Sequence, residues 1–229
     1  MTSAIDAATA RLLETADRLP DPDWSAPSLC TGWSRAHVLG HVALNAEGFG
    51  GAVLALADGR PATAYRSAEG RTADIEALAL EPPEAIRERL RTSAALFADA
   101  LARLADLEPG ATFERTPGGT VIPAAAVPGL RLREVEIHHA DLETGYTHGD
   151  WPAETVLELL DNDAPRYVSG PGFVAQASDL GREWAFGSPA PGAVTVTGPA
   201  SALAWWATGR DPGDVLSCSE GELPRMEGR

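Results

Sequence analysis

The sequence predicts an α+β protein in which an N-terminal four-helix bundle is followed by a small C-terminal α/β domain. Two observations lead to this fold class. Up to residue 149, apolar residues recur at helical spacing in four long segments, as in helices that each bury one face. From residue 150 onwards, short runs rich in valine, threonine and aromatic residues are bounded by glycine and proline, which is typical of strands. We therefore place the bundle at residues 1–149 and the small domain at residues 150–229.

Helical periodicity positions the elements of the bundle. It predicts long helices over residues 3–19, 34–57, 84–105 and 132–144, with a short helix at 73–80. Pro20 ends the first helix, Ser34 is a suitable N-cap for the second, and Pro83 opens the third at a position where proline is well tolerated. Residues 58–71 are expected to form a loop. The Pro-Gly-Gly turn at 117–119, between two β-prone runs, favours a small hairpin.

The C-terminal domain mixes both kinds of element. Helices are predicted over residues 151–168 and 199–210, and strands over residues 183–187, 193–198 and 214–221. Pro199 lies in the first turn of the second of these helices and Gly209 lies near its end. With about 80 residues the domain is small, so we expect it to depend on the bundle for part of its stability.

The composition is that of a folded globular protein with a strong negative charge. Hydrophobic residues make up 44% of the 229 residues, which is enough to bury a core. The formal net charge of −15 opposes binding to nucleic acid and to an anionic membrane surface. The N-terminus lacks the features of a secretion signal and no long apolar run suggests a membrane span, so we expect a cytoplasmic protein. Cys30 and Cys218 are too few for a disulfide framework and are expected to be reduced thiols.

The segment 132–144, LREVEIHHADLET, carries the most specific chemical signal. On a helix, Glu134 and His138 lie one turn apart on the same face, where a carboxylate and an imidazole can bind one metal ion. A third ligand must come from another helix, and His41 is the candidate because it shares a partly polar stripe with Asn45. A second interpretation remains open at this point. Glu/His pairs at this spacing are common on solvated faces, and a histidine at a bundle end can be satisfied by hydrogen bonds alone.

The other histidines are less well placed for this ion. His37 lies in the first turn of its helix, nearer the mouth of the bundle, and His148 lies in the loop before the second domain as a spare candidate. His139 points about 100° away from His138, so one helix cannot direct both side chains at one ion. Asp141 either orients an imidazole as a hydrogen-bond acceptor or is simply solvated.

Three stretches resemble the mycothiol-dependent maleylpyruvate isomerase family, and together they extend over nearly the whole chain. They are GWSRAHVLGHVALNAEGF at 32–49, LREVEIHHADLETGYTHGDWP at 132–152 and VTVTGPASALAWWATGRDPGDVLSCSEGELP at 194–224. The resemblance implies a DinB-like four-helix N-terminal domain and a small α/β C-terminal domain. It also implies that His41, Glu134 and His138 bind zinc and that Arg210, in the C-terminal GR motif, takes part in catalysis.

The function that the resemblance implies is cis–trans isomerisation of maleylpyruvate to fumarylpyruvate, a step in aromatic compound degradation. Zinc and mycothiol are then the cofactors, and the substrate is a small dicarboxylate. Reversible addition of a zinc-bound thiolate converts the cis double bond into a single bond that can rotate. A mycothiol S-transferase that conjugates electrophiles is the alternative on the same scaffold, and a non-catalytic metal-dependent binding protein is a more distant one. Two histidines and one carboxylate also suit iron, cobalt or nickel.

Overall fold

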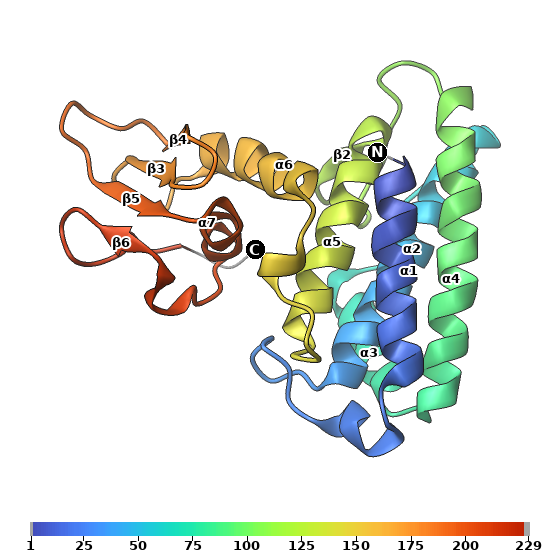
Figure 1. Cartoon of the computed structure of the whole chain (residues 1–229). Helices are drawn as coiled ribbons and strands as arrows, with labels where there is room; N and C mark the ends of the chain where they lie inside the picture. The colour runs from blue at the N-terminus through green and yellow to red at the C-terminus, as the bar shows by residue number, and fades with distance from the viewer. Residues whose placement is uncertain (1, 227–229) are drawn as a thin grey trace. The chain divides into compact units, whose positions relative to one another are not determined.

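The computed structural model describes residues 2–226 and divides into two compact units, Met1–Tyr146 and Thr147–Arg229 (Figure 1). The first unit is mainly helical and the second combines two helices with a four-stranded sheet. The α+β fold class that the sequence predicts is therefore confirmed.

The first unit is built on four helices that lie side by side in Figure 1, namely α1, α2, α4 and α5. In chain order its elements are α1 (Thr2–Arg18), α2 (Arg35–Ala57), α3 (Ala68–Ala79), α4 (Pro83–Arg103), β1 (Thr112–Glu114), β2 (Val121–Pro123) and α5 (Val127–Asp141). Strands β1 and β2 pair antiparallel with Phe113 opposite Ile122, so the hairpin expected from the Pro-Gly-Gly turn is confirmed.

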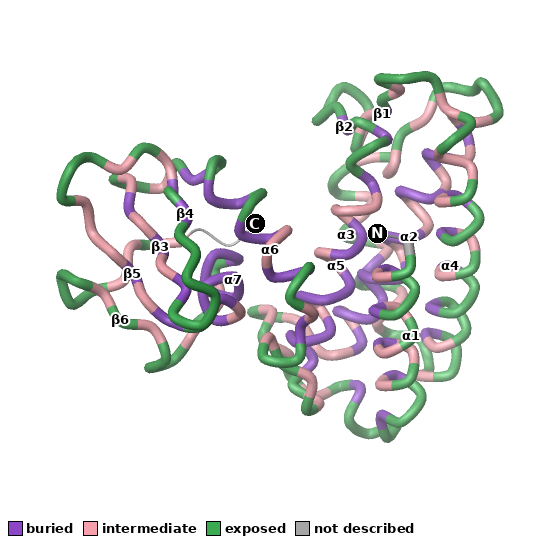
Figure 2. Tube along the Cα trace, turned by 45° about the horizontal axis from the view of Figure 1, so that its top comes forward, coloured by how far each residue is buried: buried purple, intermediate pink, exposed green. Residues whose placement is uncertain are grey.

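Helix α2 forms the centre of this unit. Its length and composition would also suit a membrane span, but 72% of its most apolar 18-residue window is buried inside the unit, as in a core helix. Gly50 lets α4 approach closely, because a Cβ atom there would lie 2.6 Å from a methyl carbon of Leu96. The exposed residues of α4 lie along its outer side in Figure 2. The bundle core therefore forms around α2.

Within the first unit, the boundaries of α3 and α5 differ most from those predicted. Helix α3 begins at Ala68 instead of residue 73, because the side chain of Ser67 caps it by accepting a hydrogen bond from the Gly70 N–H at 2.9 Å. Helix α5 begins at Val127 instead of residue 132, because Pro128 is tolerated in a first turn. It also ends earlier than predicted, at Asp141, shortly before Glu143 adopts a positive φ of 51°.

The second unit contains a sheet in the order β4-β3-β5-β6. Its elements are α6 (Ala153–Asp163), β3 (Phe173–Ala177), β4 (Arg182–Phe186), β5 (Thr195–Gly198), α7 (Ala200–Ala207) and β6 (Ser217–Cys218). Strand β3 pairs antiparallel with β4 and parallel with β5, and it was not predicted from the sequence. The helix predicted over 151–168 stops at Asp163, shortly before Pro165.

Aromatic packing holds this second unit together. Phe173 and Phe186 lie opposite each other on β3 and β4, with their rings stacked at a centroid distance of 4.7 Å. Trp206 of α7 packs on Phe173 at 5.3 Å, and most of α7 is drawn in the colour of buried residues in Figure 2. The helix is thus the hydrophobic support of the sheet.

Short 3₁₀ turns complete the two units. They are found at Asp21–Ser25, Leu104–Asp106, Ala124–Ala126, His148–Asp150, Ala164–Arg166 and Gly213–Val215.

Candidate metal centre

His41, Glu134 and His138 come together in the first unit, where α2 packs beside α5. The Oε2 atom of Glu134 lies 2.7 Å from His41 Nε2 and 3.5 Å from His138 Nε2. The two imidazole rings are 4.7 Å apart and nearly perpendicular, at 87°. One donor atom from each of the three residues lies within 4.8 Å of the others. The structure therefore brings together the three residues that the sequence singled out.

An N-cap and hydrogen bonds between chain segments fix the two helices that carry these residues. Ser34 caps α2 by accepting the His37 N–H, which starts the helix nearly two turns before His41. The Leu29 N–H donates to the Asp141 carbonyl at 2.9 Å, and Arg35 Nε donates to the Leu142 carbonyl at 2.7 Å. The start of α2 is thus tied to the end of α5, and this connection holds the ligand helices in register.

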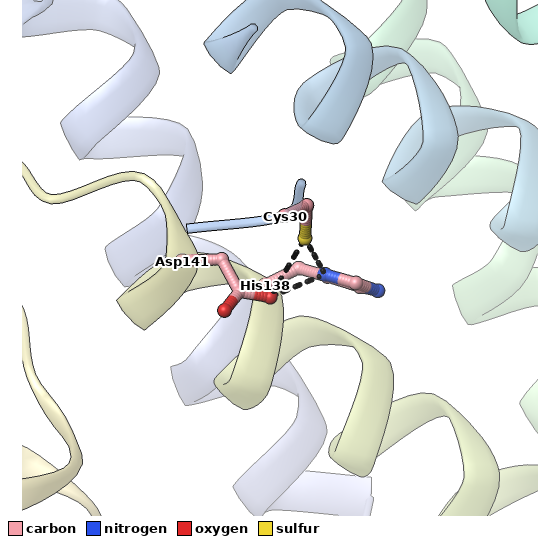
Figure 3. A group of neighbouring side chains, drawn as sticks. All are labelled: Cys30, His138 and Asp141. Atoms are coloured by element: carbon pink, nitrogen blue, oxygen red, sulfur yellow. Dashed lines mark hydrogen bonds and ion pairs between the residues drawn. The ribbon is translucent and has the colours of Figure 1, made fainter. Parts of the chain in front are cut away.

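A second group of side chains lies behind His138, as Figure 3 shows. The Nδ1 atom of His138 lies 2.8 Å from Asp141 Oδ2, and the Cys30 thiol donates to the same oxygen at 3.2 Å. The Asp141 side chain has no exposed surface. An ionised carboxylate only accepts hydrogen bonds, so His138 Nδ1 carries the proton in this contact and Nε2 is left to face Glu134.

The protonation states of the three residues suit cation binding. Burial would raise the pKa of Glu134, but hydrogen bonds from His138 and His41 hold that pKa well below its usual value. Burial lowers the pKa of His41 despite its hydrogen bond with Glu134. Burial would also lower the pKa of His138, but hydrogen bonds with Asp141, Cys30 and Glu134 raise it well above its usual value. Glu134 is thus an anion and His41 a neutral imidazole, whereas a metal must displace a proton from His138.

The donor set fits a divalent cation such as zinc. Two imidazole nitrogens and one carboxylate oxygen are a common three-ligand set for a catalytic zinc ion, which leaves a position open for another ligand. The side chains of Glu134 and His138 keep 29% and 15% of their surface exposed, so a ligand can reach this set. Cys30, His138 and Asp141 form a second set of possible donors within 4.8 Å. The two sets use opposite nitrogens of His138, and its hydrogen bond with Asp141 directs Nε2 to the first set.

Two other histidines of this unit do not join the set. His37 lies 3.1 Å from Glu76 through its Nε2 atom and takes part in the cap of α2. His139 lies on another face of α5, where its Nε2 atom is 2.8 Å from Thr15 Oγ1 and its ring stacks on Tyr146 at 3.9 Å. The angular separation expected between adjacent helical residues accounts for the position of His139.

Arg210 and His148 belong to the second unit. Arg210 donates to the Thr208 carbonyl at 3.0 Å, and its guanidinium carbon lies 5.6 Å from the centre of the Trp205 ring. The ring of His148 also stacks on Trp205, at 5.7 Å. The three-residue set of the first unit is therefore formed without Arg210, whose catalytic role stays a prediction.

Arg71 and Cys30 are the neighbours of this site that sequence reasoning missed. Arg71 Nη2 lies 2.9 Å from His41 Nδ1, on the side of the ring remote from Glu134. The sequence placed residue 71 at the end of a loop, whereas Ser67 as an N-cap would have placed it on a helix. Cys30 was expected to be a plain thiol, because no local motif indicated its contact with Asp141.

Comparisons with known proteins agree with this architecture. A family model described as the mycothiol maleylpyruvate isomerase N-terminal domain matches residues 5–143, and the C-terminal domain model of the same family matches residues 150–228. Crystal structures of the mycothiol-dependent maleylpyruvate isomerase and of a histidine-to-alanine mutant resemble the chain with a TM-score of 0.87. Each crystallised chain is 24% identical to this one, and each match covers 100% of this chain and 95% of the crystallised chain. This likeness supports the fold.

No curated protein sequence matches the chain. The two family models, however, together extend over nearly all of it, one on each side of the boundary between the two units. The chain therefore belongs to the mycothiol-dependent maleylpyruvate isomerase family.

Proposed function

We propose that this protein is a metal- and mycothiol-dependent isomerase that converts maleylpyruvate to fumarylpyruvate. The observation that carries the proposal is the convergence of His41, Glu134 and His138 from two helices in a chain of this family. The set combines an ionised carboxylate with two imidazoles and remains accessible to a ligand.

Each residue of the site has a distinct task in this proposal. His41 and His138 present their Nε2 atoms, and Glu134 supplies the negative charge that attracts a cation. Asp141 holds the proton on His138 Nδ1, which keeps Nε2 available as a ligand. A divalent cation bound here would act as a Lewis acid and keep a coordinated thiol deprotonated at neutral pH.

The chemistry of the substrate explains why a thiol is needed. A double bond conjugated with a carbonyl rotates only after reversible nucleophilic addition has made it a single bond. A carbon–sulfur bond forms while the π electrons move to the carbonyl oxygen, and expulsion of the same thiolate after rotation leaves the trans isomer with no net loss of thiol. The Cys30 thiol donates to Asp141 on the Nδ1 side of His138, so we assign the nucleophile to mycothiol.

Arg210 is the residue to which we assign the stabilisation of negative charge on the substrate. A guanidinium suits paired hydrogen bonds to a carboxylate and also stabilises the enolate oxygen that forms on addition. Within its own unit Arg210 makes a hydrogen bond to the Thr208 carbonyl and packs on Trp205. The Thr208 carbonyl and the Trp205 ring thus hold the guanidinium in place.

The test uses zinc-loaded protein and maleylpyruvate, with and without mycothiol, and follows both fumarylpyruvate and the remaining free thiol. Isomerisation that requires thiol without consuming it supports the proposal. Loss of thiol in proportion to turnover identifies an S-transferase instead. His41→Ala should abolish turnover and metal binding, whereas His37→Gln, on the same helix but outside the donor set, should retain both.

A further inference from the structure

Arg71 of α3 is a partly buried cation that contacts a proposed metal ligand. Its Nη2 atom lies 2.9 Å from His41 Nδ1, while the opposite nitrogen, His41 Nε2, faces Glu134 at 2.7 Å. Within residues 2–226 no carboxylate lies at ion-pair distance from Arg71, and its buried Nε atom has no hydrogen-bond partner. Arg66, just before α3, instead pairs with Asp74 at 2.7 Å. Arg71 therefore has a positive charge and a free donor close to the site.

The direction of the hydrogen bond between Arg71 and His41 follows from their chemistry. A guanidinium only donates, so His41 Nδ1 must be the acceptor. A neutral His41 then carries its proton on Nε2, from which it donates to Glu134.

Metal binding is incompatible with this arrangement. Coordination through Nε2 requires a lone pair on that atom, so the proton of a neutral His41 moves to Nδ1. The Nδ1–H group and the Arg71 N–H group would then point at each other as two donors. The contact at 2.9 Å must break, and the guanidinium of Arg71 loses its hydrogen bond to His41.

We propose that Arg71 is an anion-binding residue of this site, and that metal binding at His41 releases it to pair with one carboxylate of the ligand. A planar guanidinium makes paired hydrogen bonds with a carboxylate, and the partly buried position of Arg71 strengthens such a pair. Its packing on the Tyr65 ring, with the guanidinium carbon 5.5 Å from the ring centre, keeps the side chain near the site. The inference rests on the proposed metal site and on a dicarboxylate substrate, and it names the residue in the first unit that recognises that substrate.

The test measures two equilibria in the full-length protein and its Arg71→Met variant. The first is zinc affinity, determined by competition with a chromophoric chelator. The second is the binding of maleate, without thiol, to the metal-free and zinc-loaded forms by calorimetry. In the zinc-loaded form Arg71→Met should weaken maleate binding roughly 10- to 100-fold, as expected for loss of a charged hydrogen-bonded pair. Zinc affinity should stay the same or increase, because a competing hydrogen bond and a nearby positive charge are gone.

The controls separate recognition of the ligand from support of the fold. Arg66→Met removes the same charge at an exposed position and should change neither equilibrium. Arg71→Lys keeps the charge without the planar fork and should recover only part of the maleate affinity. Maleamide, the uncharged analogue, should bind the wild type and Arg71→Met equally, and the thermal midpoints show whether each variant is folded.

Two outcomes would overturn the inference. One is unchanged maleate affinity in folded, zinc-loaded Arg71→Met. The other is a parallel loss of zinc and maleate affinity, which would make Arg71 a support for His41. Maleate affinity in the wild type should also be higher with zinc than without it, and equal affinity would refute the release step. If maleate binding depends on Arg71 but maleylpyruvate is not isomerised, the proposed reaction fails while the role of Arg71 stands.

Discussion

The hydrogen bond between Asp141 and His138 is expected to contribute to metal affinity, because it orients a proposed ligand. Asp141 has no exposed side-chain surface and accepts hydrogen bonds from His138 Nδ1 at 2.8 Å and from the Cys30 thiol at 3.2 Å. Loss of such an acceptor behind a ligating histidine typically costs 10- to 100-fold in metal affinity, or about 1.4–2.7 kcal/mol. We expect Asp141→Ala to weaken zinc binding by roughly this factor. Asp141→Asn can still accept from Nδ1 and should lose less.

The assay is chelator competition at fixed pH, with thermal unfolding of the metal-free protein measured in parallel. Glu136→Gln is the matched control, because Glu136 lies on the same helix and is equally buried. It accepts hydrogen bonds from Arg11 and Tyr146, neither of which is a proposed metal ligand. The Glu136→Gln change should lower the thermal midpoint and leave the zinc dissociation constant unchanged. Wild-type zinc affinity in Asp141→Ala, or an equal loss of zinc affinity in Glu136→Gln, would show that Asp141 has no specific role in metal binding.

Three further predictions concern other residues. Cys30→Ala removes a donor to Asp141 but leaves its contact with His138, so zinc affinity by chelator competition should fall less than in Asp141→Ala, and an equal or larger loss would make Cys30 a ligand. Arg210→Met should lower the kcat/KM for maleylpyruvate roughly 10- to 100-fold at unchanged zinc affinity, and unaltered turnover with saturating thiol would exclude its assigned role. Burial lowers the pKa of His148 below 6.5, against a smaller opposing effect of Asp150, so the unfolded chain takes up a proton that the folded chain resists. His148 should therefore lower the thermal midpoint as the pH drops below about 6.5, so the midpoint of His148→Phe should fall less than that of the wild type over this range. Identical pH profiles would contradict the assignment to His148.

Much of the first unit follows from local sequence patterns. Helical periodicity predicts α1 and α4, because each buries one apolar face. The four-residue spacing of Glu134 and His138 places both on one face of α5, and Ser34 fixes where α2 begins relative to His41. These features depend on residues that are close together in the chain, so they can be predicted from the sequence alone.

Features that depend on tertiary contacts could not be predicted in this way. Strand β3 has only five residues, and its two alanines and one glutamine have little strand preference, so pairing with β4 and β5 on either side defines it. The contact of Arg71 with His41 depends on how α3 packs on α2, where Leu78 lies 3.4 Å from the position of a Cβ atom on Gly40. Cys30 and Asp141 are 111 positions apart in the sequence, so no local pattern predicts their contact.

The most direct test of the central claim is X-ray absorption spectroscopy of the zinc-loaded protein, before and after addition of thiol. Without thiol, we expect only nitrogen and oxygen ligands from His41, Glu134, His138 and solvent, at about 2.0–2.2 Å. Addition of mycothiol should introduce one sulfur ligand at about 2.3 Å. A sulfur ligand already present without thiol, and lost in Cys30→Ala, would place the ion in the set formed by Cys30, His138 and Asp141 and would contradict coordination by His41, Glu134 and His138.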